Sequence, residues 1–221
     1  MLNLDFYKNI KEELADGPTQ LVAVSKTKPA AAIQALYEQG QRIFGENKVQ
    51  ELVDKAALLP QDIQWHLIGH LQRNKVKYIA PFVSLIHAVD SLRLLKEINK
   101  EAKKNNRIIS CLLQFHIAQE DSKFGLDLAE AKALLQSEDY AQMQHIKIVG
   151  LMGMASFTDN QEQVLAEFGQ LANYFQELKA AFFAQNDDFK ELSMGMSGDY
   201  QLALQEGSTL VRIGSALFGH R

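Results

Sequence analysis

The strongest constraint on the fold is a regular alternation along the whole chain. Short runs rich in Val, Ile and Leu are separated by longer stretches with helical periodicity. The runs are too short for most helices and are apolar on both faces, which is typical of parallel strands buried on both sides. The predicted strands are 21–26, 42–47, 64–69, 85–90, 109–117, 147–156, 191–196 and 210–215. The predicted helices between them are 29–40, 47–58, 72–80, 91–106, 127–137, 160–184 and 199–206.

Eight strands with seven intervening helices predict an α/β protein that forms a single TIM (β/α)₈ barrel. An extra amphipathic helix, "MLNLDFYKNIKEELADG", precedes the first strand. A doubly wound open sheet would have fewer strands and a glycine-rich turn after the first, whereas this chain has "AVSKTKP" there. No linker or low-complexity tract interrupts the pattern, so we expect one domain over residues 1–221.

Composition excludes several classes of protein. The net charge of −4 argues against a dedicated nucleic-acid binder, and no apolar run reaches the length of a membrane span. The single cysteine, Cys111, lies in an apolar run where a core position is expected, and it fits a reducing compartment. We therefore expect a cytoplasmic protein with neither nucleic acid nor membrane as a partner.

The loops after the last two predicted strands carry small polar residues. "MSGD" (196–199) and Gly214-Ser215 each lead into a short helix, whose backbone N–H groups suit an anion. Either loop alone is explained equally well as a turn or a helix cap. Loops after strands seven and eight of a barrel frequently bind phosphate, so the pair together suggests a phosphate site.

The first predicted strand ends on a lysine. Lys26 shares one face of that strand with Val22 and Val24, so it is expected where the buried face opens into the pocket. Barrel closure brings Arg212 onto the neighbouring strand, and partial burial near this arginine would lower the pKa of the Lys26 amine. The alternative is a lysine that simply reaches solvent from a strand end. Lys28 directly precedes a proline in the loop and is expected to be solvated, so Lys26 is the candidate for a Schiff base.

A nucleophilic lysine, a phosphate cradle and an arginine at one barrel mouth suggest pyridoxal 5′-phosphate (PLP) as the cofactor. The aldehyde would meet Lys26, the phosphate would meet the two loops, and the ring nitrogen would meet Arg212. A Schiff-base aldolase acting on a phosphosugar would use the first two parts and stays an alternative. The arginine favours PLP.

Seven blocks of the sequence, in order, resemble one known family. They are "AVSKTKP", "FGENKVQE", "WHLIGHLQRNK", "SKFG", "GLMGMA", "LSMGMSGDY" and "GSTLVRIGSALFG". Together they resemble the pyridoxal phosphate homeostasis proteins, which are related to the N-terminal barrel domain of alanine racemase. The resemblance covers nearly the whole of residues 21–219.

The resemblance implies a role for individual residues. It implies that Lys26 binds PLP and that Arg212 is the partner of the pyridine nitrogen. The other residues implied to contact the cofactor are Asn47, Met196, Ser197, Gly214 and Ser215. Met152 and His66 would line either the ring pocket or the core. His116 stands where many relatives have asparagine, so the role of that strand end stays open.

The resemblance also implies a function without an established reaction. It implies a protein that holds PLP as a Schiff base and serves intracellular PLP, vitamin B6 and amino-acid homeostasis, with PLP-dependent apo-enzymes as partners. The alternative is a weak racemase-like PLP enzyme acting on amino acids. Racemases of this fold add a second domain that supplies a tyrosine as acid/base and forms the dimer. We therefore expect a monomer without two-base racemisation, with no catalytic residue and no metal site assigned.

Overall fold

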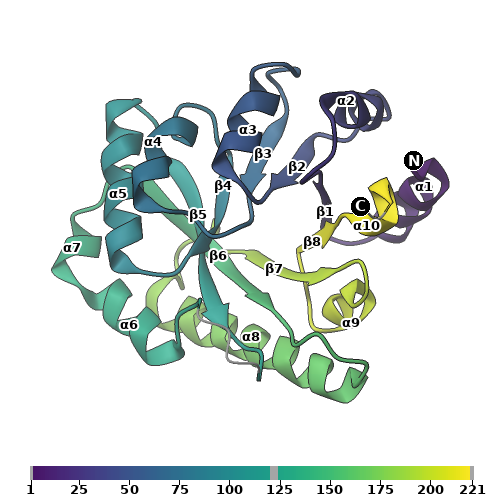
Figure 1. The fold of residues 1–221 in the computed structure, drawn as a ribbon. Coiled ribbons are helices and arrows are strands. Elements are labelled where there is room, and N and C mark those ends of the chain that lie inside the picture. The colour runs from purple at the N-terminus through teal and green to yellow at the C-terminus, as the bar shows by residue number, and fades with distance from the viewer. Residues whose placement is uncertain (1, 120–123, 220–221) are drawn as a thin grey trace.

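The predicted strands pair in parallel, in chain order, and close into a barrel between the first and the last (Figure 1). The computed structural model describes residues 2–119 and 124–219, so Ser122 and Lys123 of the "SKFG" block lie outside the described residues. The strands are β1 (Gln20–Val24), β2 (Ile43–Glu46), β3 (Gln64–Leu67), β4 (Leu85–Val89), β5 (Ile109–His116), β6 (Ile146–Met154), β7 (Glu191–Met196) and β8 (Leu210–Ile213). The predicted TIM barrel is confirmed.

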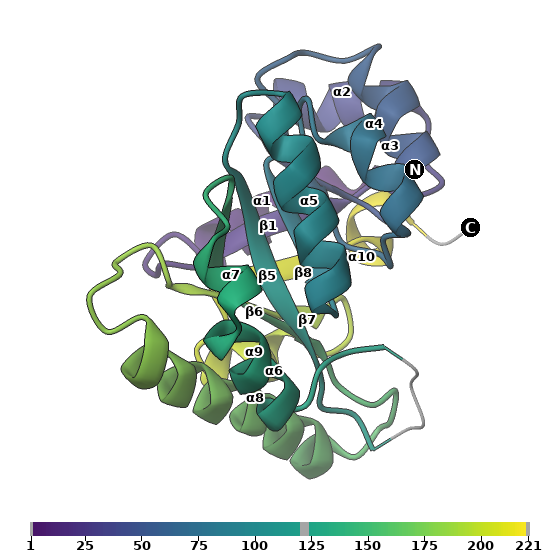
Figure 2. The same cartoon turned by 90° about the vertical axis from the view of Figure 1, so that its left-hand side faces the viewer.

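Helices cover the outside of the barrel, as the two views at right angles show (Figure 2). They are α1 (Leu4–Glu13), α2 (Ala30–Glu38), α3 (Val49–Ala56), η1 (Arg73–Lys75), α4 (Val76–Ile79), α5 (Leu92–Lys104), α6 (Leu128–Gln136), α7 (Glu138–Ala141), α8 (Gln161–Phe182), α9 (Tyr200–Gln205) and α10 (Ser215–Phe218). Each predicted helix is present, although the stretch 72–80 begins as a 3₁₀ turn. The four-residue helix α7 was not predicted, because it is too short to show a period.

The core has two layers, one inside the barrel and one between the strands and the helices. The inner layer consists of Val22, Leu85, Ala88, Leu112, Val149, Met152 and Leu210. The outer layer is larger and includes Phe44, Leu52 and Cys111. Cys111 is fully buried, as expected, and burial raises the pKa of its thiol. Two apolar layers explain why the strands are apolar on both faces.

Barrel closure places the first and last strands side by side. In the parallel pairing of β1 with β8, Val22 lies opposite Arg212, so both side chains point into the barrel. Outside the barrel, α1 lies against α10, and the Asn3 N–H donates to the Leu217 carbonyl oxygen at 2.7 Å. Within the described residues, no helix is both long and apolar enough to cross a membrane.

Candidate functional site

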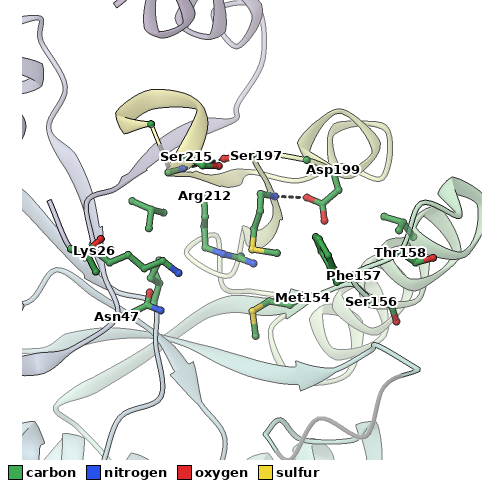
Figure 3. Close-up of a pocket in the computed structure, with 18 of the residues that line it drawn as sticks. Lys26, Asn47, Met154, Ser156, Phe157, Thr158, Ser197, Asp199, Arg212 and Ser215 are labelled. Atoms are coloured by element: carbon green, nitrogen blue, oxygen red, sulfur yellow. Dashed lines mark hydrogen bonds between the residues drawn. The ribbon is translucent and has the colours of Figure 1, made fainter. Parts of the chain in front are cut away.

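A cavity of about 610 Å³ opens at the C-terminal ends of the strands. Its lining comes mainly from the ends of β1, β2, β3, β6, β7 and β8 and from the loops that follow them, which are far apart in the sequence (Figure 3). The lining includes all seven residues proposed from the sequence as contacts of the cofactor: Lys26, Asn47, Met196, Ser197, Arg212, Gly214 and Ser215. The structure therefore brings the predicted site residues together in one place.

Lys26 and Asn47 point into the cavity from the same side (Figure 3). β1 ends at Val24, and Lys26 follows in a turn rather than in the strand itself. Its side chain is exposed, so the expectation of a partly buried lysine is wrong for this structure. Asn47 lies directly against the chain after β3, where a Cβ on Gly69 would come within 2.5 Å of the Asn47 carbonyl oxygen. A glycine at position 69 is needed for this close approach.

Lys28 has a different environment from the one expected. The side chain is half-buried, and its Nζ donates to the carbonyl oxygens of Phe218 at 3.1 Å and Gly219 at 2.8 Å. These carbonyls end α10, where a lysine also complements the negative end of the helix dipole. The prediction of a solvated Lys28 is therefore wrong, because this lysine joins the β1–α2 loop to the C-terminal end of α10.

The opposite wall of the cavity is built from the loops after β7 and β8. The Gly214 N–H donates to Ser197 Oγ at 3.3 Å, which links the two loops, and Ser215 begins α10. Asp199 Oδ1 accepts from the Met196 N–H at 2.5 Å. Burial raises the pKa of the Asp199 carboxyl, against the opposing effects of the Met196 N–H and Arg212. This wall presents hydroxyl and amide groups that can bind an anion.

Arg212 reaches the cavity from the inside of the barrel. Its guanidinium donates to Ser193 Oγ at 2.6 Å and to the Gly153 carbonyl oxygen at 3.0 Å. Burial lowers the pKa of Arg212 to about 10, against the charge of Asp199, so the group is a cation at neutral pH. Two fixed hydrogen bonds hold this cation in one orientation at the floor of the cavity.

A chain of buried polar groups continues from Arg212 across the barrel interior, and we name it the inner chain: Arg212, Ser193, His87 and His66. Ser193 Oγ lies 2.9 Å from His87 Nδ1, and His87 Nε2 lies 3.0 Å from His66 Nδ1. A guanidinium only donates, so Ser193 Oγ accepts from Arg212, and the two ring nitrogens of His87 contact Ser193 on one side and His66 on the other. Burial lowers the pKa of His66 to about 3 and that of His87 well below its usual value. Both imidazoles are neutral in the folded protein.

Three further residues singled out in the sequence lie elsewhere. Met152 packs in the inner core layer and His66 belongs to the inner chain, so neither lines the described cavity. His116 ends β5 and is half-buried, and it is not among the lining residues either. Core packing, one of the two roles considered for Met152 and His66, is the one that the structure supports.

Other lining residues were not proposed as contacts from the sequence. The loop after β6 contributes Ser156, Phe157 and Thr158 (Figure 3). Glu167 on α8 anchors this loop, since it accepts from the Ser156 N–H at 2.6 Å and from Ser156 Oγ at 2.7 Å. The position of this loop after a barrel strand was a usable signal, but its composition gave no chemical reason to select it.

The donors around the cavity fit a phosphorylated aldehyde with a ring nitrogen. An amine stands on one wall, serine hydroxyls stand on the other, and a fixed guanidinium forms part of the floor. The volume is in the range of ordinary cofactor sites. No group of three or more His, Cys, Asp or Glu side chains in the described part of the chain could hold a metal ion. Fold and site together define a lysine-bearing (β/α)₈ barrel of the kind that binds a phosphorylated cofactor.

Comparison with known proteins narrows this class. Residues 6–221 match the family model of the alanine racemase N-terminal domain. A pyridoxal phosphate homeostasis protein from Aquifex aeolicus is 39% identical over 203 residues, which cover 91% of this chain and 87% of the relative. The chain therefore belongs to the family of pyridoxal phosphate homeostasis proteins with the alanine racemase N-terminal fold.

Solved structures agree with this family. PipY of Synechococcus elongatus PCC7942, solved without PLP, superimposes with a TM-score of 0.90 at 37% identity, covering 97% of this chain and 99% of PipY. PipY with PLP bound gives a TM-score of 0.87 at the same identity and the same coverage of both chains. The barrel described here is thus similar to one whose structure has been determined in both the free and the PLP-bound forms.

Proposed function

We propose that this protein binds PLP covalently through Lys26 and serves the homeostasis of intracellular PLP and of amino acids. The observation that carries the proposal is the convergence of Lys26, the serine hydroxyls and Arg212 on one cavity. In this proposal Ser197 and Ser215, with Met196 and Gly214, hold the phosphate, and Asn47 lies beside the ring. PipY, which has been solved with PLP bound, supports the choice of cofactor.

The chemistry of the ring pocket is compatible with a carrier, although racemases of this fold share the arginine and this point alone does not decide against an enzyme. PLP supplies an aldehyde that condenses with a lysine amine with release of one water. Arg212 is held by Ser193 and Gly153 and is protonated at neutral pH, so it would donate to the ring nitrogen and leave that nitrogen unprotonated. An unprotonated ring is a weaker electron sink for amino-acid chemistry. We infer a protein without a dedicated reaction that passes PLP to apo-enzymes. We also propose that it acts as a cytoplasmic monomer.

Borohydride trapping tests the covalent attachment. Purified protein is incubated with PLP, reduced with borohydride and digested, and the modified peptide is mapped. We expect the PLP on Lys26 and no modified peptide in Lys26→Ala. Lys28→Met is the control, because Lys28 is the neighbouring lysine and its loss should leave the modification on Lys26. Mapping of the label to another lysine in the wild type would contradict the proposal.

Transfer and turnover experiments separate a carrier from an enzyme. The PLP-loaded protein is mixed with an apo-enzyme, and the recovery of that enzyme's activity is followed. The same protein is then tested for racemisation across a panel of amino acids. We expect transfer without turnover, whereas turnover that is abolished in Lys26→Ala would establish the racemase-like alternative.

A further inference from the structure

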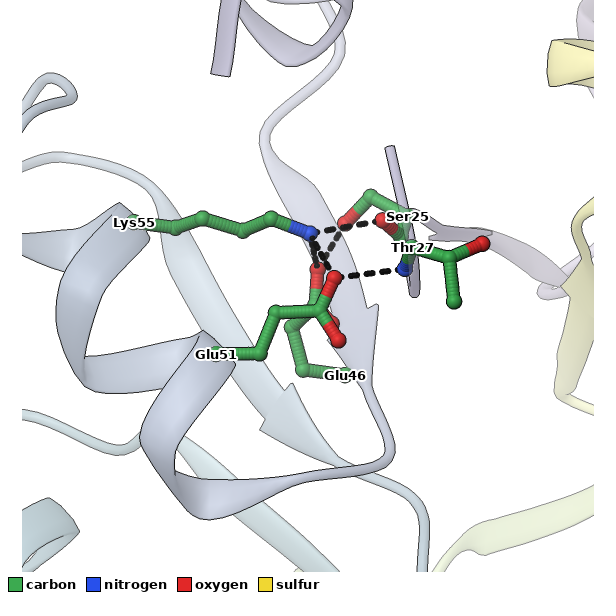
Figure 4. Close-up of polar contacts among 5 residues, drawn as sticks. All are labelled: Ser25, Thr27, Glu46, Glu51 and Lys55. Carbon is green, nitrogen blue, oxygen red and sulfur yellow. Dashed lines mark hydrogen bonds and ion pairs between the residues drawn. The ribbon is translucent and has the colours of Figure 1, made fainter. Parts of the chain in front are cut away.

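The turn that carries Lys26 is held by a buried polar cluster on the outside of the barrel. This cluster, named here the outer cluster, consists of Ser25, Glu46, Glu51 and Lys55 (Figure 4). Its base lies between β2 and α3, beside the outer layer of the core. None of these four residues lines the cavity. A role for the cluster at the site must therefore pass through the turn.

The outer cluster grips the backbone on both sides of Lys26. Lys55 Nζ donates to the Ser25 carbonyl oxygen at 2.7 Å, and the Thr27 N–H donates to Glu51 Oε1 at 2.5 Å (Figure 4). These two groups belong to the peptide bonds immediately before and after Lys26. Lys55 Nζ and Glu51 Oε1 also form an ion pair with each other at 2.7 Å. We call this ion pair and its two contacts with the backbone around Lys26 the clamp.

The clamp holds a strained turn. The Lys28 N–H donates to the Ser25 carbonyl oxygen at 3.0 Å, which makes Thr27 the third residue of the turn. Thr27 has a φ of 65°, in the left-handed region that turns of this kind normally fill with glycine. A β-branched residue there costs about 1–3 kcal/mol and persists only when its surroundings hold it. Glu51 supplies the contact that holds it.

The base of the cluster is an expensive arrangement for stability alone. Glu46 is fully buried and pairs with Lys55 at 2.7 Å, and Ser25 Oγ donates to the same carboxylate oxygen at 2.6 Å. The other oxygen, Glu46 Oε2, is buried without a hydrogen-bond partner among the described residues. Buried ion pairs are frequently no more stabilising than apolar side chains of similar size. Such a cluster fits a positioning role better than a purely stabilising one.

We propose that the Glu51–Lys55 pair is a positioning device that aims Lys26 at the PLP aldehyde. The inference rests on the proposed function, because it presumes that Lys26 is the attachment point. Fixing the peptide groups on both sides of one residue restricts the directions in which its side chain leaves the backbone. Preorganisation of this kind reduces the entropy lost when the covalent bond forms.

Two ligands distinguish positioning from general support of the site. The affinity for PLP includes the covalent bond to Lys26. Pyridoxine 5′-phosphate has an alcohol in place of the aldehyde, so its affinity depends only on the contacts with the ring and the phosphate. We expect Glu51→Ala to weaken PLP binding by about tenfold and to change binding of pyridoxine 5′-phosphate by less than about twofold. Glu51→Gln keeps an acceptor for the Thr27 N–H and should restore much of the loss.

A double-mutant cycle tests whether the effect passes through Lys26. In the Lys26→Ala background, Glu51→Ala should leave the affinity for PLP unchanged, because the residue that it positions is gone. Lys55→Met, measured alongside, should weaken PLP binding in the same selective way as Glu51→Ala. Lys147→Met is the matched control, since it breaks an exposed pair with Asp188 at the start of β6, at the opposite end of the barrel.

The outcomes separate the two proposals. Equal weakening of both ligands, or an undiminished effect of Glu51→Ala in the Lys26→Ala background, would overturn the positioning role and leave the proposed function standing. Absence of covalent PLP from Lys26 in the wild-type protein would overturn the proposed function itself. Glu51 lies in the first turn of α3 and is only half-buried, whereas Lys55 is buried, so Glu51→Ala is expected to fold even if Lys55→Met does not.

Discussion

The inner chain and the outer cluster are two buried polar networks that lie on opposite sides of the barrel wall. The inner chain holds Arg212 through neutral histidines and a serine inside the barrel. The outer cluster holds the Lys26 turn through an ion pair and a buried carboxylate outside it. The inner chain lies behind Arg212 and the outer cluster lies behind Lys26, two of the basic residues that line the cavity.

The difference between the networks follows from what each one holds. Arg212 carries its own charge, so neutral acceptors suffice to orient it, and a second charge inside the barrel would be costly. The Lys26 turn is strained neutral backbone, and charged groups make stronger hydrogen bonds to backbone than neutral ones do. The two networks should therefore respond differently to substitution and to pH.

The largest effect is expected from removing the buried carboxylate of the outer cluster. Glu46→Ala leaves the buried Lys55 ammonium without its fully buried partner, so the free energy of unfolding should fall by about 3 kcal/mol or more. Equilibrium unfolding in urea measures this loss. Asp188→Ala is the control, because it breaks an exposed ion pair with Lys147 and should cost less than about 1 kcal/mol. A similar loss of stability in Glu46→Ala and Asp188→Ala would show that the buried ion pair contributes no more to stability than the exposed one.

The next largest effect is expected from lowering the pH, which should reduce the free energy of unfolding through the two histidines of the inner chain. His66 has a folded pKa of about 3 against an ordinary value of 6.5, and the pKa of His87 is also lowered. Below pH 6.5 the unfolded chain binds protons that the folded protein does not, so stability falls as pH falls from 6.5 towards 3. The slope is small at pH 7 and approaches about 1.4 kcal/mol per pH unit for each histidine well below pH 6.5. Urea unfolding between pH 7 and pH 5 checks it.

The outer cluster should respond to acid in the opposite direction. Burial raises the pKa of Glu46, so in the interval just above its ordinary value the folded protein binds more protons than the unfolded chain. A His66→Gln variant lacks one of the two buried imidazoles of the inner chain, so it should show a shallower loss of stability with falling pH than the wild type. An unchanged slope in this variant would mean that the acid sensitivity arises elsewhere.

A smaller effect is expected from removing a neutral hydroxyl of the inner chain. Ser193→Ala removes one of the two acceptors of Arg212 and the hydroxyl that contacts His87 Nδ1, so the free energy of unfolding should fall by about 1–3 kcal/mol. Affinity for pyridoxine 5′-phosphate should fall as well, because Arg212 loses one of its two fixed bonds. Thermal and urea unfolding, together with a ligand titration, measure the two effects. An unchanged affinity would show that Gly153 alone orients the arginine.

The smallest effect concerns the strain in the Lys26 turn. Thr27→Gly allows the positive φ without steric conflict but increases the freedom of the unfolded chain, so stability should rise by no more than about 1 kcal/mol. Affinity for PLP should not improve, because the clamp already holds the turn. A tighter complex with PLP in Thr27→Gly would argue that the strain opposes binding.

The sequence was sufficient for the barrel because most of the strands are short runs that are largely apolar on both faces. It was also sufficient to bring Lys26, Ser197 and Arg212 together, since strand ends in a barrel gather at one mouth. It did not reveal that Lys26 follows its strand in a turn, because that turn depends on Thr27 and on contacts with Glu51, which lies 24 residues further along. β1 thus ends before Lys26 because of tertiary contacts that the local sequence does not show.

The two networks themselves could not be predicted. His87 and Ser193 are separated by 106 residues and meet only because strands β4 and β7 face each other inside the barrel. The sequence shows two polar residues within apolar runs but carries no register between distant strands. Lys28 was likewise misjudged, because its partners are backbone carbonyls that have no signature in the sequence.

The bonds from Lys28 to Phe218 and Gly219 join groups that are 190 and 191 positions apart. Contacts of such long range form late in folding, because the chain between them must be ordered first. On a ribosome, the β1–α2 loop emerges long before the segment that completes the cavity around it. The cavity is lined both by the β1–α2 loop and by the segment after β8, so it is complete only when the barrel has closed, and a cofactor bound there would report completed folding.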